Sequence, residues 1–282
     1  MKRGGLALAF VVASITACGR GPARGWTGSG QEVHINAREY SFSGPSRITG
    51  GIVSLRVVNS GEEPHQAAFY RLGRKVTVEQ ALDAFKRDES GGAAGKLMSP
   101  VGGANTVLPG RSQRLALRLP AGSYALFCFV RGADGQLHAQ RGMVAGLAVR
   151  GGGMRTAVPH NSGSVVLRDT GIDIPPSLSA FRATIRVRNE GTRLHEMAFL
   201  RFPAGRTVAD LVTWLTALSQ GASAGPAPFL EGGGVTALPP KAEAWVGTEF
   251  DSGPHVAVSF AAGPDGRADA LGGLLAPFVV GG

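Results

Sequence analysis

Apolar and polar residues alternate along much of the chain, and this pattern predicts short β-strands. Apolar side chains occupy every second position from 53 to 57 and again from 115 to 119. A period of two places them on one face of a half-buried strand. Two segments break the pattern with helical spacing. They begin at Thr77 and Thr207, each followed three residues later by a residue suited to a capping box. The sequence therefore predicts an all-β protein with few helices.

The chain also contains two copies of one pattern. Residues 56–71 are matched by residues 186–201 without a gap, and each copy carries an Asn-x-Gly motif followed by a histidine, His65 or His195. With one gap the match resumes and continues for most of each copy. A repeat of this length is a whole domain. We predict two tandem β-sandwiches, at 32–149 and 160–280, each with one inserted short helix and joined by a glycine-rich linker at 150–159.

Composition supports many turns and excludes one class of partner. The 43 Gly and 17 Pro favour short strands joined by turns over long helices. The formal net charge is +9, but the arginines are scattered, and no basic block is interleaved with aromatic residues. Nucleic acid is therefore not an expected partner.

The first eighteen residues look like an export signal. A cationic start precedes an apolar run from Leu6 to Ala17, which is too short to span a bilayer comfortably. The run ends Ile15-Thr16-Ala17-Cys18-Gly19, which resembles a bacterial lipoprotein lipobox. The resemblance implies that Cys18 is lipidated and that 19–31 is a flexible tether. The protein would then be lipid-anchored in the bacterial cell envelope, on the periplasmic or extracytoplasmic face. The alternative is an ordinary cleaved signal in which Cys18 is incidental.

Four residues of the first copy carry candidate metal chemistry: His65, Cys128, His138 and Met143. If Cys18 carries lipid, Cys128 has no disulfide partner, and a lone thiol in an exported protein needs a reason. Two imidazoles and a thiolate suit copper, with a thioether as a weak axial ligand.

The arrangement of these residues resembles the cupredoxins, the blue-copper proteins. The resembling pieces are Asn59-x-Gly61 with His65 a few residues on, and residues 121–128 leading to His138 and Met143. The resemblance implies a Greek-key β-sandwich and one copper held by these four residues. Residues 129–137 make the Cys–His spacing longer than is usual in the family. A turn at Asp134-Gly135 would fold them into a small hairpin and return His138 to position. Alternatively, the loop belongs to the fold, since the second copy keeps its length.

The second copy lacks this ligand set. Ser259, Asp269 and Leu274 stand where the first copy has cysteine, histidine and methionine, and only His195 remains. A hydroxyl, a carboxylate and one imidazole are a poor copper set, so no copper is expected there. His195-Glu196 would be an internal hydrogen-bonded pair or part of a docking surface.

No sequence feature predicts an enzyme. Ser259, His255 and Asp269 look like a catalytic triad on paper, but Ser259 and His255 are four apart on one predicted strand, so they lie far from each other. The function we expect is a membrane-anchored copper-binding protein. It would be a one-electron carrier or copper holder, with a redox or copper-trafficking protein as a possible partner. The alternative is a metal-free binding or scaffold lipoprotein in which the repeated motif and histidine are fold determinants.

Overall fold

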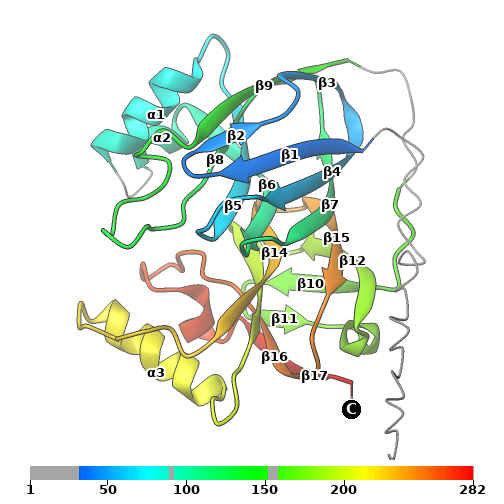
Figure 1. The fold of residues 1–282 in the computed structure, drawn as a ribbon, viewed down its shortest axis with the longest axis vertical. Coiled ribbons are helices and arrows are strands. Elements are labelled where there is room, and N and C mark those ends of the chain that lie inside the picture. Colours follow the sequence, from blue (N-terminus) through cyan, green and yellow to red (C-terminus); the bar gives the residue numbers. More distant parts are fainter. Residues whose placement is uncertain (1–31, 89–91, 152–157, 282) are drawn as a thin grey trace, which may run out of the picture.

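The computed structural model describes residues 32–88, 92–151 and 158–281. The predicted signal segment, Cys18 and the tether lie outside these residues, as does most of the predicted linker. Within the described residues the chain is mostly strand, which confirms the all-β prediction (Figure 1). No helix in this part of the chain has both the length and the apolar character that crossing a membrane requires.

The strands of the described chain form two sheets, and each sheet runs through both halves of the molecule. The first sheet has eight strands, in the order β11 (Gly171–Asp173), β10 (Gly163–Arg168), β12 (Arg182–Asn189), β15 (Glu243–Glu249), β7 (Ser112–Leu119), β4 (Gly51–Asn59), β1 (Val33–Arg38) and β2 (Ser41–Ser43). The second has nine, in the order β17 (Leu275–Val280), β16 (Gly253–Val258), β13 (His195–Arg201), β14 (Leu230–Leu238), β6 (Met98–Val107), β5 (His65–Leu72), β8 (Gly122–Phe127), β9 (Val144–Arg150) and β3 (Arg47–Thr49).

The two halves meet strand to strand. β7 pairs with β15 in the first sheet, and β6 pairs with β14 in the second, both antiparallel. One apolar cluster extends between the sheets through both halves, with Leu55 and Leu117 on one side and Val187 and Val246 on the other. The tandem sandwiches therefore share their sheets and their core.

Helices cover the second sheet in each half. α1 (Val78–Arg87) and α3 (Val208–Ser219) both begin with the predicted capping boxes. Ala81, Ala84 and Phe85 of α1 pack with Ala125 and Phe127 of β8. A four-residue helix, α2 (Gly92–Gly95), accompanies α1, so the first half has one helix more than expected. Figure 1 shows α1 and α3 on the same side of the molecule.

Strand register locates the gap in the repeat. Ala104 pairs with Ala67, and Val235 pairs with Met197 at the matching place in the second half. The extra residue of the second half therefore lies before Val235. Gly103 and Gly234 are then equivalent, and a Cβ on either would approach the carbonyl oxygen of the neighbouring strand within 2.1 Å. Only glycine fits at this position.

Candidate metal centre

Three predicted ligands come together at one end of the first half. His65 begins β5, Cys128 directly follows β8, and His138 lies in the loop between β8 and β9. All three side chains are fully buried. Their candidate ligand atoms lie within 4.8 Å of one another, and among the described residues no other group of histidine, cysteine and acidic side chains has this arrangement.

The loop after Cys128 is a small hairpin, and this hairpin returns His138 to the site. Gly135 takes a positive φ of 79° at the turn, and Arg131 bridges Leu137. Backbone hydrogen bonds then close the loop, from His138 N to Val130 O at 2.9 Å and from Ala139 N to Cys128 O at 2.9 Å. The long spacing between cysteine and histidine therefore does not separate their side chains.

Distances within the cluster suit three ligands of one metal ion. His65 Nδ1 lies 3.1 Å from His138 Nδ1 and 3.9 Å from Cys128 Sγ, and His138 Nδ1 lies 3.5 Å from the same sulfur. Metal–nitrogen and metal–sulfur bonds of about 2.0–2.3 Å in a trigonal plane place the ligand atoms about 3.5–3.7 Å apart. The backbone N–H of Gln66 donates to the sulfur at 3.3 Å, a contact that favours a thiolate.

Met143 also lies at this end of the sandwich. It is fully buried and packs in one small cluster with Cys128 and Ala37. Cys128 N donates to Met143 O at 3.3 Å, so the two backbones are adjacent. Met143 N also donates to His138 O at 2.9 Å, so the fourth predicted residue lies beside Cys128 and next to the backbone of His138.

Two carboxylates, which the sequence did not single out, face the outer nitrogens of the histidines. Glu39 Oε1 lies 3.3 Å from His65 Nε2. Glu63 Oε2 lies 2.8 Å from His138 Nε2, at ion-pair distance but off the line of a hydrogen bond, and neither atom has another partner. Glu63 follows the Asn-x-Gly motif closely, a hint the sequence offered. Glu39 lies at the end of β1 and carried no signal. Carboxylates in this position orient a metal-binding imidazole and strengthen it as a donor.

Side chains of the outer loops cover His138. The Tyr40 ring packs edge-on against the His138 ring with centroids 5.0 Å apart. The Arg141 guanidinium lies over the Tyr40 ring, 4.6 Å from its centroid, and forms an ion pair with Asp134. This cover keeps the imidazole out of water.

Burial sets the protonation of the cluster. Burial raises the pKa of the Cys128 thiol to about 11 and lowers the pKa of both His65 and His138. Near neutral pH the imidazoles are therefore uncharged and free to bind a cation, while the thiol loses its proton only to a strong positive charge. Backbone N–H donors, Glu63 first, lower the pKa of Glu39 to about 2, so that carboxylate is ionised.

The donor set fits copper. Neutral imidazole nitrogens suit Cu(II), and thiolate and thioether sulfurs suit Cu(I). Two Nδ1 atoms and a sulfur converge in a buried, largely preformed position, with a carboxylate behind each imidazole. These residues therefore meet the chemical requirements of a copper centre.

The matching end of the second half holds an ion network instead. His195 Nδ1 lies 2.7 Å from Asp269 Oδ2, and His195 Nε2 lies 2.9 Å from Asp169 Oδ1. Asp269 also accepts hydrogen bonds from Arg193 Nη1 at 3.0 Å and from Ser259 Oγ at 3.2 Å. Each residue at a replaced ligand position therefore has another role here: Ser259 and Asp269 form hydrogen bonds, and Leu274 packs in the core.

Two expectations about this second site are resolved. The partner of His195 is not Glu196, as one sequence interpretation held, because the Glu196 carboxylate accepts from Phe260 N at 3.2 Å instead. Adjacent strand residues point to opposite faces of a sheet, which explains the difference. Ser259 and His255 do not form a triad, since His255 Nδ1 lies 3.0 Å from Gly253 O.

Comparisons with known proteins give likenesses at the level of structure. No protein-family profile matches the sequence, and no curated protein matches it. Auracyanin A of Chloroflexus aurantiacus, a "blue" copper protein, is 18% identical over 43% of this chain and 98% of its own, with a TM-score of 0.30. An azurin of Methylomonas sp. strain J is 12% identical over 42% of this chain and 97% of its own, with a TM-score of 0.29. A multicopper oxidase is 11% identical over 89% of this chain and 88% of its own, with a TM-score of 0.24.

The site does not depend on these likenesses, because its geometry comes from this chain alone. The described chain has an all-β fold of two sheets, and one end of its first half carries a buried cluster of two histidines and a cysteine that could hold a metal ion.

Proposed function

We propose that the protein is a membrane-anchored copper-binding lipoprotein of the bacterial cell envelope, acting as a one-electron carrier or copper holder. The observation that carries the copper proposal is the convergence of His65 Nδ1, His138 Nδ1 and Cys128 Sγ within 4.8 Å of one another. Met143 is the proposed fourth, axial ligand. Bound copper would supply a reversible one-electron couple, and no substrate turnover is part of the proposal.

The protein's own residues prepare this site. Glu39 and Glu63 lie beside the outer Nε2 atoms of His65 and His138, a position that favours the tautomers in which Nδ1 is free to bind a metal ion. The Gln66 N–H stabilises negative charge on the sulfur of Cys128. Because these groups are ordered before any ion binds, little rearrangement is needed on loading or on electron transfer.

The membrane anchor rests on the sequence around Cys18. Acyl chains on that residue would hold the domains at a membrane surface without a spanning helix, since each buried methylene contributes about 0.8 kcal/mol. The proposed partners are the membrane and a redox or copper-trafficking protein. Mass spectrometry of the protein from its own envelope tests the anchor, because lipidation adds the acyl mass to a peptide that begins at Cys18.

Copper binding is tested by adding Cu(II) to the purified full chain and recording the visible spectrum and the bound stoichiometry. We expect one equivalent of copper and an intense thiolate charge-transfer band. Cys128→Ser, which copies Ser259 of the second half, is expected to abolish the band. The matched control is His195→Ala, which is expected to leave the band unchanged.

The opposite results have clear meanings. A chain that binds no stoichiometric copper and shows no band would favour the metal-free scaffold, in which Cys128 is a buried apolar residue. If His195→Ala loses copper and Cys128→Ser retains it, the copper site lies in the second half and the assignment to the first half is wrong.

A further inference from the structure

A cavity of about 610 Å³ lies at the junction of the two halves, away from the copper cluster. Tyr124 lines it at the start of β8, whereas Cys128 follows the other end of that strand. Both halves contribute to its wall. Its volume falls within the roughly 300–1,000 Å³ of small-molecule sites.

Charged side chains of one sign dominate the wall. Five cations line it against two carboxylates, an excess of three positive charges; the cations are Arg71, Arg118, Arg186, Arg188 and Lys241. A second cavity is also lined by basic side chains, namely Arg71, Arg74, Lys75 and Lys96, but all of these belong to the first half, whereas the junction cavity gathers positive charge from both halves.

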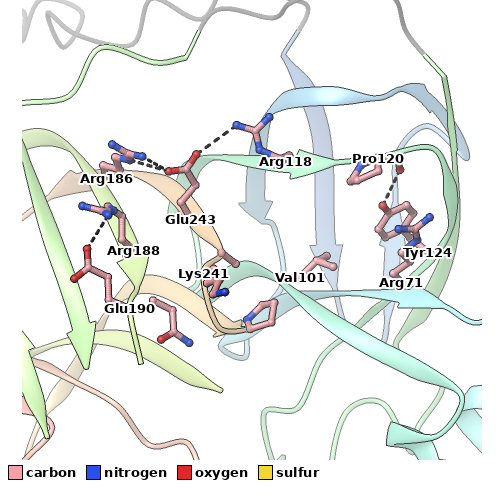
Figure 2. Close-up of a pocket in the computed structure, with 13 residues that line it drawn as sticks. Arg71, Val101, Arg118, Pro120, Tyr124, Arg186, Arg188, Glu190, Lys241 and Glu243 are labelled. Atoms are coloured by element: carbon pink, nitrogen blue, oxygen red, sulfur yellow. Dashed lines mark hydrogen bonds and ion pairs between the residues drawn. The ribbon is translucent and has the colours of Figure 1, made fainter. Parts of the chain in front are cut away.

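The two carboxylates orient the arginines without neutralising the site. Glu243 Oε1 lies 3.4 Å from Arg118 Nη2, while its Oε2 accepts from Arg186 Nε at 2.9 Å. Arg188 Nη2 lies 2.7 Å from Glu190 Oε1. Figure 2 shows Glu243 between Arg118 of the first half and Arg186 of the second, with Lys241 below them. Guanidinium groups held in this way keep donors available for a further anion.

Lys241 occupies a backbone conformation that costs free energy. Its φ is 65°, in the left-handed region that residues other than glycine rarely adopt. The equivalent position in the first half is Gly110, since Gly110 N donates to Asn59 O just as Lys241 N donates to Asn189 O. Strain of this kind at a non-glycine residue is typical of a functional position. No partner of the Lys241 ammonium is recorded within the described chain, so its charge is available to a ligand.

The repeat provides an internal control for the charge of the cavity. Register makes Arg188 the equivalent of Val58, and Arg118 the equivalent of Glu249. With Lys241 replacing Gly110, three of the five cations stand where the other copy has an apolar residue, a carboxylate or glycine. The fold therefore does not require positive charge at these three positions, so the charges point to a role other than folding.

We propose that this junction cavity binds a small phosphate-bearing anion with at least two negative charges. Arginine forks match the geometry of phosphate oxygens, and lysine adds a compact point charge. Three uncompensated positive charges within one cavity repel one another, and a multivalent anion removes that repulsion while linking the two halves. The source of the phosphate is either a soluble metabolite or an anionic lipid headgroup.

The test uses metal-free full chain and inorganic pyrophosphate as the probe, with binding followed by calorimetry and by thermal unfolding. Lys241→Gly and Arg188→Val each remove one cation. Each variant also introduces the residue type found at the equivalent position of the first half, Gly110 or Val58. Lys241→Gly also relieves the backbone strain, so it is expected to fold. Arg111→Ala is the matched control, because Arg111 is an exposed arginine of the equivalent turn outside the cavity.

We expect pyrophosphate to bind the wild-type chain and to raise its melting temperature, with affinity falling as salt rises. Each cavity variant is expected to weaken binding by about tenfold or more, as for loss of a charged hydrogen-bond donor. Arg111→Ala is expected to bind as the wild type does.

A second arm distinguishes the source, using vesicles that contain cardiolipin, whose headgroup carries two phosphate groups. Lys241-dependent binding of pyrophosphate in solution supports a soluble anion, whereas Lys241-dependent binding confined to the vesicles assigns the site to headgroups. Equal binding by wild type and both cavity variants in both arms overturns the proposal. The outcome is independent of copper binding.

Discussion

His65 and His195 occupy the same position in the two halves, yet each faces a different chemistry. Both begin a strand after an Asn-x-Gly turn, and both rings are fully buried. In each half the asparagine side chain binds the same two backbone carbonyls at 2.7 to 2.8 Å. Nε2 faces a carboxylate in both halves, Glu39 or Asp169. The difference lies at Nδ1, which faces a sulfur and a second imidazole in the first half and the Asp269 carboxylate in the second.

The comparison separates the features that the fold requires from those that the proposed copper site requires. The hairpin after β8 has a counterpart after β16, where Gly263 N bonds Arg267 O and Asp269 N bonds Ala261 O. The turn, the loop length and the buried histidine are therefore properties of the fold. The cysteine, second histidine and methionine are not. An ion network lies in the second half where the first half has the candidate metal cluster, with Arg193 standing where the first half has Glu63.

The largest expected effect comes from giving the second half the proposed ligand residues of the first. Ser259→Cys, Asp269→His and Leu274→Met, combined with Arg193→Glu, give the second half the residues of the first. Because backbone geometry is shared, we expect a second equivalent of copper and a doubled charge-transfer band. The measurement is metal content with visible spectroscopy. The same four changes in the background of Cys128→Ser form the control, where one equivalent of copper is expected. If no copper binds in that background, the shared backbone geometry is not sufficient to make the second half bind copper.

The ion network should matter most to the stability of the apo protein. Asp269 is 3% exposed and holds both His195 and Arg193. Asp269→Ala leaves the buried Nδ1 of His195 without its carboxylate, and Arg193 keeps only the longer contact with Asp169, so we expect a loss of about 3–5 kcal/mol in unfolding free energy. Urea denaturation measures it. Asp265→Ala, which removes an exposed pair in the same loop, is expected to cost less than about 1 kcal/mol. Similar losses in both variants would contradict the role given to burial.

The carboxylate behind His138 sharpens the comparison at the copper site. Glu63→Gln keeps the size of the side chain but removes its charge, so the imidazole becomes a weaker donor. We expect Cu(II) affinity to fall by about 10- to 100-fold, as for other partners of metal-binding histidines. Competition with a chelator of known affinity measures this change. Glu62→Gln is the control, because Glu62 is exposed and does not face the ring. An unchanged Cu(II) affinity would show that the Glu63 carboxylate does not affect metal binding by His138.

The smallest effect expected concerns acid sensitivity of the second half. Hydrogen bonds from Thr192, followed by His195, hold the pKa of Asp169 below its usual value. A depressed pKa in the folded state contributes stability above the unfolded pKa of about 3.9, and this contribution is lost as pH falls below it. We expect the unfolding free energy of apo wild type to fall more steeply below about pH 4 than that of Asp169→Asn. Asp251→Asn, at an exposed residue, is the control. Parallel curves for wild type and Asp169→Asn would contradict the assignment.

The ligand residues of the candidate site were predictable because their types are chemically distinctive. One cysteine, two histidines and a methionine stand out in a repeated β-protein, and the absence of three of them from the second copy gave the contrast. Glu39 was not predictable, since a surface carboxylate at the end of a strand has no sequence signature. Only the parallel pairing of β1 with β4 brings it next to the turn before His65.

Local patterns in the sequence determined the strands, the capped helices, the repeat and the identity of the candidate ligands, because each depends on residues near in the chain. The tertiary structure alone decided that the two sandwiches share both sheets, that Arg193 and Asp269 close around His195, and that charges from both halves meet in one cavity. Those outcomes depend on contacts between residues far apart in the chain: 74 residues separate His195 from Asp269, and more than one hundred separate β7 from β15. Alternation within a strand fixes which side chains are buried, but it carries no information about which strand becomes the neighbour.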